Sequence, residues 1–162
     1  MVSIYDNNGI RFDNSGTIIF KGHCNIGSGS GISVGRGGCI IFGNNFQATQ
    51  GLRIVCYNNI TFGENTLIGW NNMFTDTHFH NLSDTNKVVL SNQNKCIFIG
   101  DDRWFGLNCS TMPGSKIPDK CVIASNSLLN IEYSDSYCLY AGISAIPKRH
   151  GIWHYPEISR NE

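Results

Sequence analysis

Residues 99–130 decide the fold, and they read IGDDRW FGLNCS TMPGSK IPDKCV IASNSL LN when divided into sixes. A large apolar residue opens every group except the third, which opens with Thr111. The next residue is mostly small or turn-forming, such as Gly100, Gly106 and Pro118. A period of six fits neither an amphipathic helix nor a long half-buried strand, but it fits a short strand and a corner, repeated. The pattern therefore predicts an all-β fold, a parallel β-helix built from hexapeptide repeats.

The same period appears less regularly in the first half of the chain. The motif Ile40-Ile41-Phe42-Gly43 recurs at residues 60–63 and again at residues 97–100. The first interval is 20 residues, so we expect the early coils to carry two extra residues at a corner. Residues 1–22 are interpreted as a capping coil. We predict a β-helix domain over residues 1–134 with a loop excursion at residues 81–96, followed by a short C-terminal segment over residues 135–162. The alternative, a β-sandwich with coincidental spacing, does not account for six consecutive hexads.

Composition excludes several classes of partner. The net charge of the 162 residues is zero, and no basic stripe is visible, so nucleic acid is not an expected partner. No apolar run approaches membrane-spanning length and no signal peptide is recognisable. Seven cysteines occur, an odd number, without a Cys-x-x-Cys motif, which favours a protein of the reducing cytoplasm. They are expected to fill the core, as Cys109 and Cys121 do at the small inward position of the hexad.

The hexad period breaks after Phe74, where residues 75–80 read Thr-Asp-Thr-His-Phe-His before a polar stretch. Loops on rigid scaffolds often hold functional residues, and imidazole is the side chain whose pKa lies near neutral pH. His78 and His80 are therefore candidate general bases for removing a proton from a hydroxyl or an amine. Asp76 is a candidate for holding the histidine tautomer. The alternative is that both are surface-loop histidines without a role.

Three segments resemble the hexapeptide-repeat O-acetyltransferases of the maltose, galactoside and polysaccharide group. Residues 68–80 resemble that family's stretch ending in Asp-x-Asp-x-His, and residues 99–108 resemble its IGD-x-x-W-IG-x-N. Residues 113–117 and 141–145 resemble its PG-x-x-I and its closing AG-x-PA. The similarity spans roughly residues 60–150. This chain departs from the family at His78, where the family has its second Asp, and at Ser144, where the family has Pro.

The resemblance implies a left-handed β-helix, a homotrimer and active sites in the clefts between subunits. It implies acetyl-CoA as co-substrate, a sugar or saccharide as acceptor and His80 as the general base, with His78 as the alternative base. Asn71 is a candidate for binding the acceptor, or else belongs to a ladder of corner residues.

The resemblance also implies where the coenzyme lies. The pantetheine arm would pass Gly106, Ala124 and Ser125, using backbone hydrogen bonds, and Trp104 would shape the cleft. The phosphates would meet Lys148 and Arg149, side chains that suit such contacts. The alternative for these two residues is a solvated basic tail.

The leading hypothesis is an acetyl-CoA-dependent O-acetyltransferase acting on a sugar hydroxyl in surface polysaccharide or O-antigen biosynthesis. An N-acetyltransferase of a nucleotide-linked amino sugar fits the same scaffold. A zinc hydratase needs three histidine ligands, but only His78 and His80 are grouped, so no metal is expected. A non-enzymatic β-helix would explain the coils but not the histidine motif.

Overall fold

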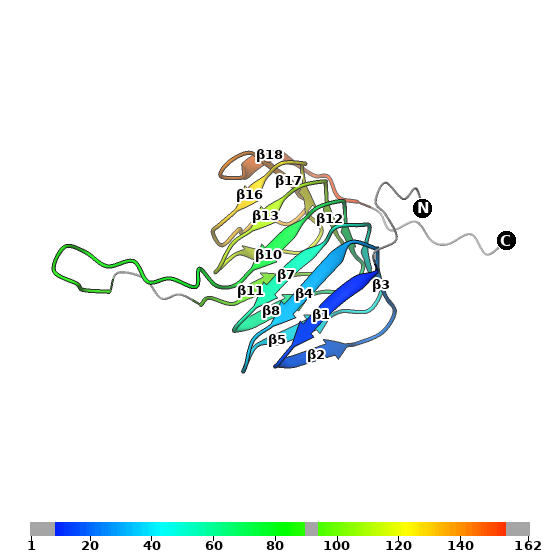
Figure 1. Ribbon diagram of the computed structural model, residues 1–162. Coiled ribbons are helices and arrows are strands. Elements are labelled where there is room, and N and C mark those ends of the chain that lie inside the picture. Colours follow the sequence, from blue (N-terminus) through cyan, green and yellow to red (C-terminus); the bar gives the residue numbers. More distant parts are fainter. Residues whose placement is uncertain (1–8, 90–93, 155–162) are drawn as a thin grey trace.

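The computed structural model describes residues 9–89 and 94–154, whose strands form three sheets wound into triangular coils (Figure 1). Sheet A contains β1 (Ile10–Asn14), β4 (Ser30–Val34), β7 (Arg53–Cys56), β10 (Met73–Thr75), β13 (Ser110–Thr111) and β16 (Leu128–Leu129). Sheet B contains β2 (Thr17–Phe20), β5 (Cys39–Phe42), β8 (Asn59–Phe62), β11 (Ile97–Ile99) and β14 (Lys116–Ile117). Sheet C contains β3 (Cys24–Ile26), β6 (Phe46–Ala48), β9 (Thr66–Ile68), β12 (Arg103–Phe105), β15 (Val122–Ile123), β17 (Cys138–Ala141) and β18 (Ile146–His150).

Successive coils pair in parallel, which confirms the predicted β-helix. Ile40 lies in register with Ile60, and Ile60 with Ile97, so the three copies of the sequence motif stack on one another. Parallel pairing continues as far as β17, which lies beside β15. The chain then reverses, and β18 pairs antiparallel with β17 at the edge of sheet C.

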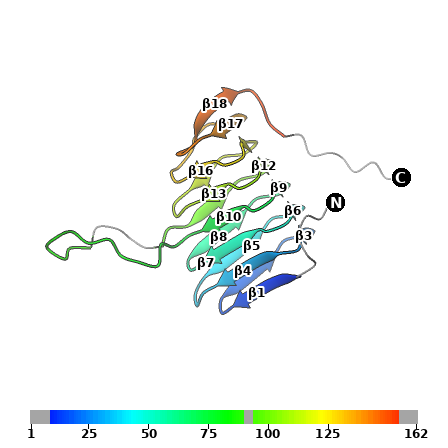
Figure 2. The same ribbon diagram turned by 45° about the horizontal axis from the view of Figure 1, so that its top comes forward.

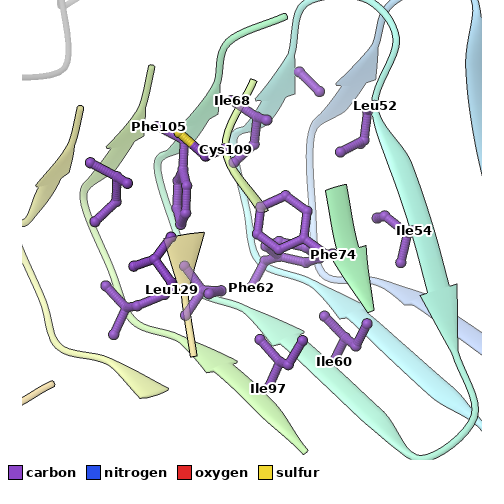
Figure 3. Close-up of a cluster of buried hydrophobic side chains, with 14 of the residues drawn as sticks. Leu52, Ile54, Ile60, Phe62, Ile68, Phe74, Ile97, Phe105, Cys109 and Leu129 are labelled. Carbon is purple, nitrogen blue, oxygen red and sulfur yellow. The ribbon is translucent and has the colours of Figure 1, made fainter. Parts of the chain in front are cut away.

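The core fills the inside of the prism with aliphatic and aromatic side chains from all three sheets (Figure 3). The rings of Phe42 and Phe62 stack with centroids 5.5 Å apart and planes 2° apart, because they occupy the same position in adjacent coils. Phe62 meets Phe74 edge to face at 5.0 Å. Cys109 and Cys121 are buried at the inward positions where the sequence predicted compact fillers.

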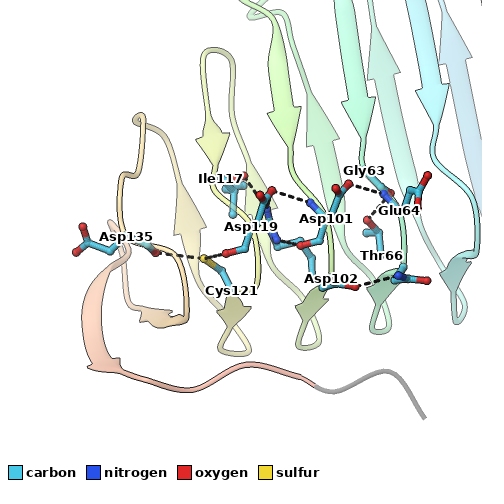
Figure 4. A network of polar contacts seen from close by, with 11 residues as sticks. Gly63, Glu64, Thr66, Asp101, Asp102, Ile117, Asp119, Cys121 and Asp135 are labelled. Atoms are coloured by element: carbon cyan, nitrogen blue, oxygen red, sulfur yellow. Dashed lines mark hydrogen bonds and ion pairs between the residues drawn. The ribbon is translucent and has the colours of Figure 1, made fainter. Parts of the chain in front are cut away.

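The corner between sheets B and C is closed by a polar network (Figure 4). The Asp101 carboxylate accepts the Glu64 N–H at 2.8 Å, and the Asp119 carboxylate accepts the Asp101 N–H at 3.0 Å. Arg103 is fully buried, and its guanidinium donates to the carbonyls of Asp101 and Ile117 and to Asp119. Burial lowers the pKa of this arginine. The charge is tolerated because carbonyls and one carboxylate converge on it.

A long loop leaves the prism between β10 and β11, at the corner between sheets A and B (Figures 1 and 2). This is the position at which the break in the hexad period predicted an excursion; residues 90–93 of that loop lie outside the described residues. Neither described range contains a helix long and apolar enough to cross a membrane.

Candidate active site

The two candidate bases flank a tight turn at the root of the loop. The His80 N–H donates to the His78 carbonyl at 2.7 Å, across Phe79, whose φ is 58°. This is a γ-turn, a strained conformation for a bulky residue, and such strain persists only where the surroundings hold it. Both histidine side chains are exposed, and neither imidazole makes a hydrogen bond or ion pair with the described residues. Each imidazole is therefore available to a ligand.

Threonine hydroxyls fix the residues that lead into this turn. The Thr75 hydroxyl donates to the Thr77 carbonyl at 2.9 Å, and the Thr77 hydroxyl accepts the Phe79 N–H at 3.0 Å. The returning limb of the loop is joined to the same segment, because the Lys95 N–H donates to the Asp76 carbonyl at 3.0 Å. Thr77 also forms an antiparallel bridge with Asn94. The loop root is thus held rigidly against sheet A.

Asp76 lies just before the histidines but points into the protein. Its side chain is fully buried, and its two carboxylate oxygens accept the N–H groups of Tyr57 and Asn58 at 2.7 and 2.8 Å. The Cys56 thiol donates to the same carboxylate at 3.3 Å. Burial and the Asp76 charge raise the pKa of Cys56 to about 12. Asp76 therefore stabilises the preceding coil, and no hydrogen bond joins it to either imidazole within the described residues.

Tyr57 supports the turn from the coil before it. Its ring meets the Phe79 ring edge to face, with centroids 5.1 Å apart. On its other side the Tyr57 ring lies over Gly35, where an added Cβ would come within 2.5 Å of the ring. Sequence reasoning did not identify Tyr57. The strand register identifies it, because Val55 pairs with Thr75, and the residues after Val55, including Tyr57, must then lie beside the residues after Thr75.

The residues expected beside the pantetheine lie at the corner between sheets C and A. At Gly106 an added Cβ would come within 2.7 Å of the Ser125 nitrogen, so the glycine keeps two coils in close approach. The N–H groups of Gly106 and Ala124 are used by the sheet, since they donate to the carbonyls of Ile123 and Tyr140. The Ser125 N–H makes no hydrogen bond to the described residues. Ser125 is thus the backbone donor at this corner that a ligand could use.

Asn71 lies at the same corner, one coil earlier. Its φ is 58°, and its N–H donates to the Gln50 carbonyl at 2.9 Å. Asn108 and Asn126 repeat that conformation in the next two coils, and their side chains hydrogen-bond to each other at 2.7 Å. Asn71 therefore belongs to the corner ladder, and acceptor binding by it stays a prediction.

The remaining predicted coenzyme residues lie on sheet C. Trp104 is exposed on β12, with its ring 5.5 Å from that of His154. Arg149 stands in the same row across the sheet, because Trp104 pairs with Val122, Val122 with Leu139 and Leu139 with Arg149. Lys148 is the exposed neighbour of Arg149 on β18.

The structure places the predicted residues in two groups. The histidines lie at the corner between sheets A and B, whereas Asn71, Gly106 and Ser125 lie at the corner between sheets C and A. Seven residues separate Asn71 from His78, which corresponds to roughly 20 Å along the sheet. One chain therefore does not bring the two groups together. Within residues 9–89 and 94–154 no cluster of three or more His, Cys, Asp or Glu side chains could hold a metal ion.

Comparison with known proteins gives one curated relative and several solved structures. Over 124 residues the chain is 25% identical to "Putative lipopolysaccharide biosynthesis O-acetyl transferase WbbJ" of Escherichia coli K12. That alignment covers 72% of this chain but 63% of the relative, so the chain spans less than two thirds of its length. The structure of the polySia-specific acetyltransferase NeuO matches with a TM-score of 0.70 and 24% identity, over 90% of this chain and 70% of that one. No family model matches.

A galactoside acetyltransferase in complex with coenzyme A matches with a TM-score of 0.59 and 22% identity, over 83% of this chain and 64% of that one. The resemblance to the hexapeptide-repeat acetyltransferases is confirmed. The match to these solved structures supports the β-helix fold that the sequence predicted. The roles of individual residues in this chain stay predictions.

Proposed function

We propose that this protein is an acetyl-CoA-dependent O-acetyltransferase that acetylates a hydroxyl of a saccharide, with His80 as general base. The observation that supports this most is the fixed turn at the loop root, which presents two imidazoles that bond to none of the described residues, on a hexapeptide-repeat scaffold. The name of the curated relative points to surface-polysaccharide synthesis, and we extend that setting to this chain as part of the proposal.

His80 acts through its neutral imidazole. It takes the proton of the acceptor hydroxyl as the oxygen bonds to the acetyl carbon, and it returns that proton to the departing thiolate. Acetyl-CoA supplies the activated acetyl group. The γ-turn fixes the backbone that carries the imidazole, and the Tyr57–Phe79 contact resists movement of the turn. His78 is the alternative base, since it is exposed on the same turn.

The corner between sheets C and A fits the coenzyme. Gly106 lets the next coil approach closely, and the Ser125 N–H beside it is available to a carbonyl of the pantetheine arm. Trp104 offers an exposed ring on the adjoining face, and Lys148 with Arg149 adds positive charge at the end of sheet C for the phosphates.

We further propose that a homotrimer completes each site. Within one chain the base lies at the corner between sheets A and B, and Gly106 and Ser125 lie at the corner between sheets C and A. A site that needs both groups must therefore take them from two copies of the chain. Mixing two inactive variants tests this. A His80→Asn protein and a Lys148→Glu/Arg149→Glu protein, mixed after dissociation and reassembly, should regain activity. Absence of recovery in a mixture shown by light scattering to form trimers would place the whole site in one chain.

The base is tested by replacing each histidine with Asn and measuring acetyl transfer to sugar acceptors. His80→Asn should lower kcat by about 10²- to 10⁴-fold. His23→Asn is the matched control, because His23 is exposed on a distant coil. Loss of activity in His78→Asn alone would move the base to His78, and full activity in both variants would refute a histidine base. Including amino sugars linked to nucleotides among the acceptors separates O-acetylation from N-acetylation.

A further inference from the structure

A depression of about 370 Å³ lies on sheet A, over strands β1, β4, β7 and β10. Its lining residues include Arg11, Asp13, Gly31, Ser33 and Arg53. None of them is among the residues that the sequence singled out. The depression lies on the sheet whose strand β10 leads into the candidate bases, with Arg53 one coil before β10 and Arg11 three coils before it.

A glycine between two arginines forms the floor of this depression. Gly31 lies in register with Arg11 on one side and with Arg53 on the other. Adjacent strands lie about 4.8 Å apart, so the two arginine Cα atoms flank the glycine at roughly 10 Å from each other. A Cβ added at Gly31 would meet nothing within 4 Å. The missing side chain therefore leaves open space between two long cationic side chains.

Neither guanidinium group forms an ion pair with the residues that the structure describes. The ion pairs found within the described residues are Arg103 with Asp119 and Lys116 with Glu132, and neither involves this face. Of the charged lining residues, two are arginines and one is Asp13, which gives the depression a net charge of +1 in a protein of net charge zero. Planar guanidinium groups suit carboxylate and phosphate oxygens, which they bind through paired hydrogen bonds.

The next row of side chains along the sheet begins with Asp13 and Ser33, two polar residues that suit hydroxyl groups. Asp13 pairs with Ser33, and Ser33 with Val55. Val55 in turn pairs with Thr75, the last residue of β10 before the histidine turn. The strands thus run from the cationic row through a polar row toward the candidate base. A saccharide lying along them would have its anionic group upstream and its hydroxyls downstream.

We propose that Arg11 and Arg53 clamp an anionic group of the acceptor, a carboxylate or a phosphate, across Gly31, so that the acceptor is an acidic saccharide. This rests on the proposed function, because it names the substrate class of that same site. The coenzyme phosphates are a less suitable occupant, since Lys148 and Arg149 lie on a different sheet, at the other end of the prism.

The test measures binding by calorimetry, without turnover. The probes are an acidic oligosaccharide that has one carboxylate per sugar, its carboxyl-reduced form, a sugar phosphate and free coenzyme A. Arg11→Gln and Arg53→Gln should each weaken binding of the anionic saccharide about 10- to 100-fold, because each removes charge-assisted hydrogen bonds. Gly31→Val should weaken it as well without lowering the melting temperature, because the added atoms enter open space and a β-branched residue suits a strand.

Arg36→Gln is the matched control, since Arg36 is an exposed arginine outside the depression. The carboxylate and phosphate probes distinguish the two sources of the anion. Unchanged binding of both anionic probes in all three variants would overturn the proposal, and weaker binding of coenzyme A alone would assign the arginines to the coenzyme instead. Intact anionic-saccharide binding without acetyl transfer would reject the proposed function but keep the clamp. Acetyl transfer to neutral sugars that is unaffected by replacing Arg11 or Arg53 would keep the proposed function but reject the clamp.

Discussion

Replacing Asp76 separates a structural role from a catalytic one. The carboxylate is fully buried and accepts two backbone N–H groups, those of Tyr57 and Asn58, at 2.7 and 2.8 Å. A hydrogen bond to a charged partner contributes about 1.5–3 kcal/mol, and a buried donor left without a partner costs its desolvation. Asp76→Ala should therefore lower the free energy of unfolding by about 3–6 kcal/mol.

Asp76→Asn gives the sharper comparison. The amide oxygen can accept one of the two N–H groups, but the amide nitrogen is a donor and cannot accept the other. We expect this variant to lose about half as much stability, roughly 1.5–3 kcal/mol. Urea denaturation followed by circular dichroism measures both variants, and kcat is compared at a temperature where each is folded.

Asp84 supplies a matched control in the same loop. One of its carboxylate oxygens also accepts two backbone N–H groups, from Asn86 and Val88 at 2.9 Å each, but it lies in the protruding hairpin rather than in the core. Asp84→Ala should cost less than about 1 kcal/mol of global stability, since the unpaired groups are hydrated. The reasoning is refuted if Asp76→Asn unfolds at the urea concentration of the wild type while its kcat falls and its pH profile shifts. That result would mean that Asp76 orients an imidazole.

Three further perturbations follow from the same contacts. Tyr57→Leu should lower kcat several-fold with little change in KM, because the edge contact that holds Phe79 is lost; an unchanged kcat contradicts this. Arg103→Ala should lower the free energy of unfolding, measured by urea denaturation, by about 3 kcal/mol, and Arg103→Met should lower it less. Asp119→Asn should lower it by under about 1 kcal/mol, because the Asp119 side chain is 62% exposed. Equal losses in the Arg103 and Asp119 variants would show that the ion pair dominates. The pKa of Cys56 is raised from 9.0 to about 12, so the unfolded thiol loses its proton first and stability should fall as pH rises above about 9. Cys56→Ala should reduce that slope in urea midpoints measured at several pH values, and an unaltered slope contradicts the assignment.

The hexad period predicted the coils because it depends on side chains alone. An apolar residue every six positions has to face inward, and stacked coils then place Ile40, Ile60 and Ile97 in one column. The same reasoning located the loop, since a break in the period must leave the prism. Arg103 occupies a position where the pattern expects a small residue, and it is tolerated because carbonyls of neighbouring residues converge on it.

The role of Asp76 could not be predicted in this way. Its partners are backbone N–H groups 18 and 19 residues earlier, and every residue other than proline offers such a group, so no sequence pattern marks them. The clamp on sheet A was missed for a related reason. Arg11 and Arg53 are 42 residues apart and become neighbours only through the register of β1, β4 and β7.

Sheet A links the proposed parts of the site and fixes the distance between them. Arg53 pairs with Met73, and Thr77, at the start of the histidine turn, lies four residues after Met73. At about 3.3 Å per residue this places the row of the arginines roughly 13 Å upstream of the turn, measured along the strand direction. Parallel strands in a stacked prism cannot slip without moving every inward side chain to the outer face. If the anion is held by the arginines, the hydroxyl that meets His80 is then selected by the length of β10 rather than by contacts at the base itself. The same base and coenzyme corner could therefore serve different acceptors on other β-helices, through changes confined to the first three coils.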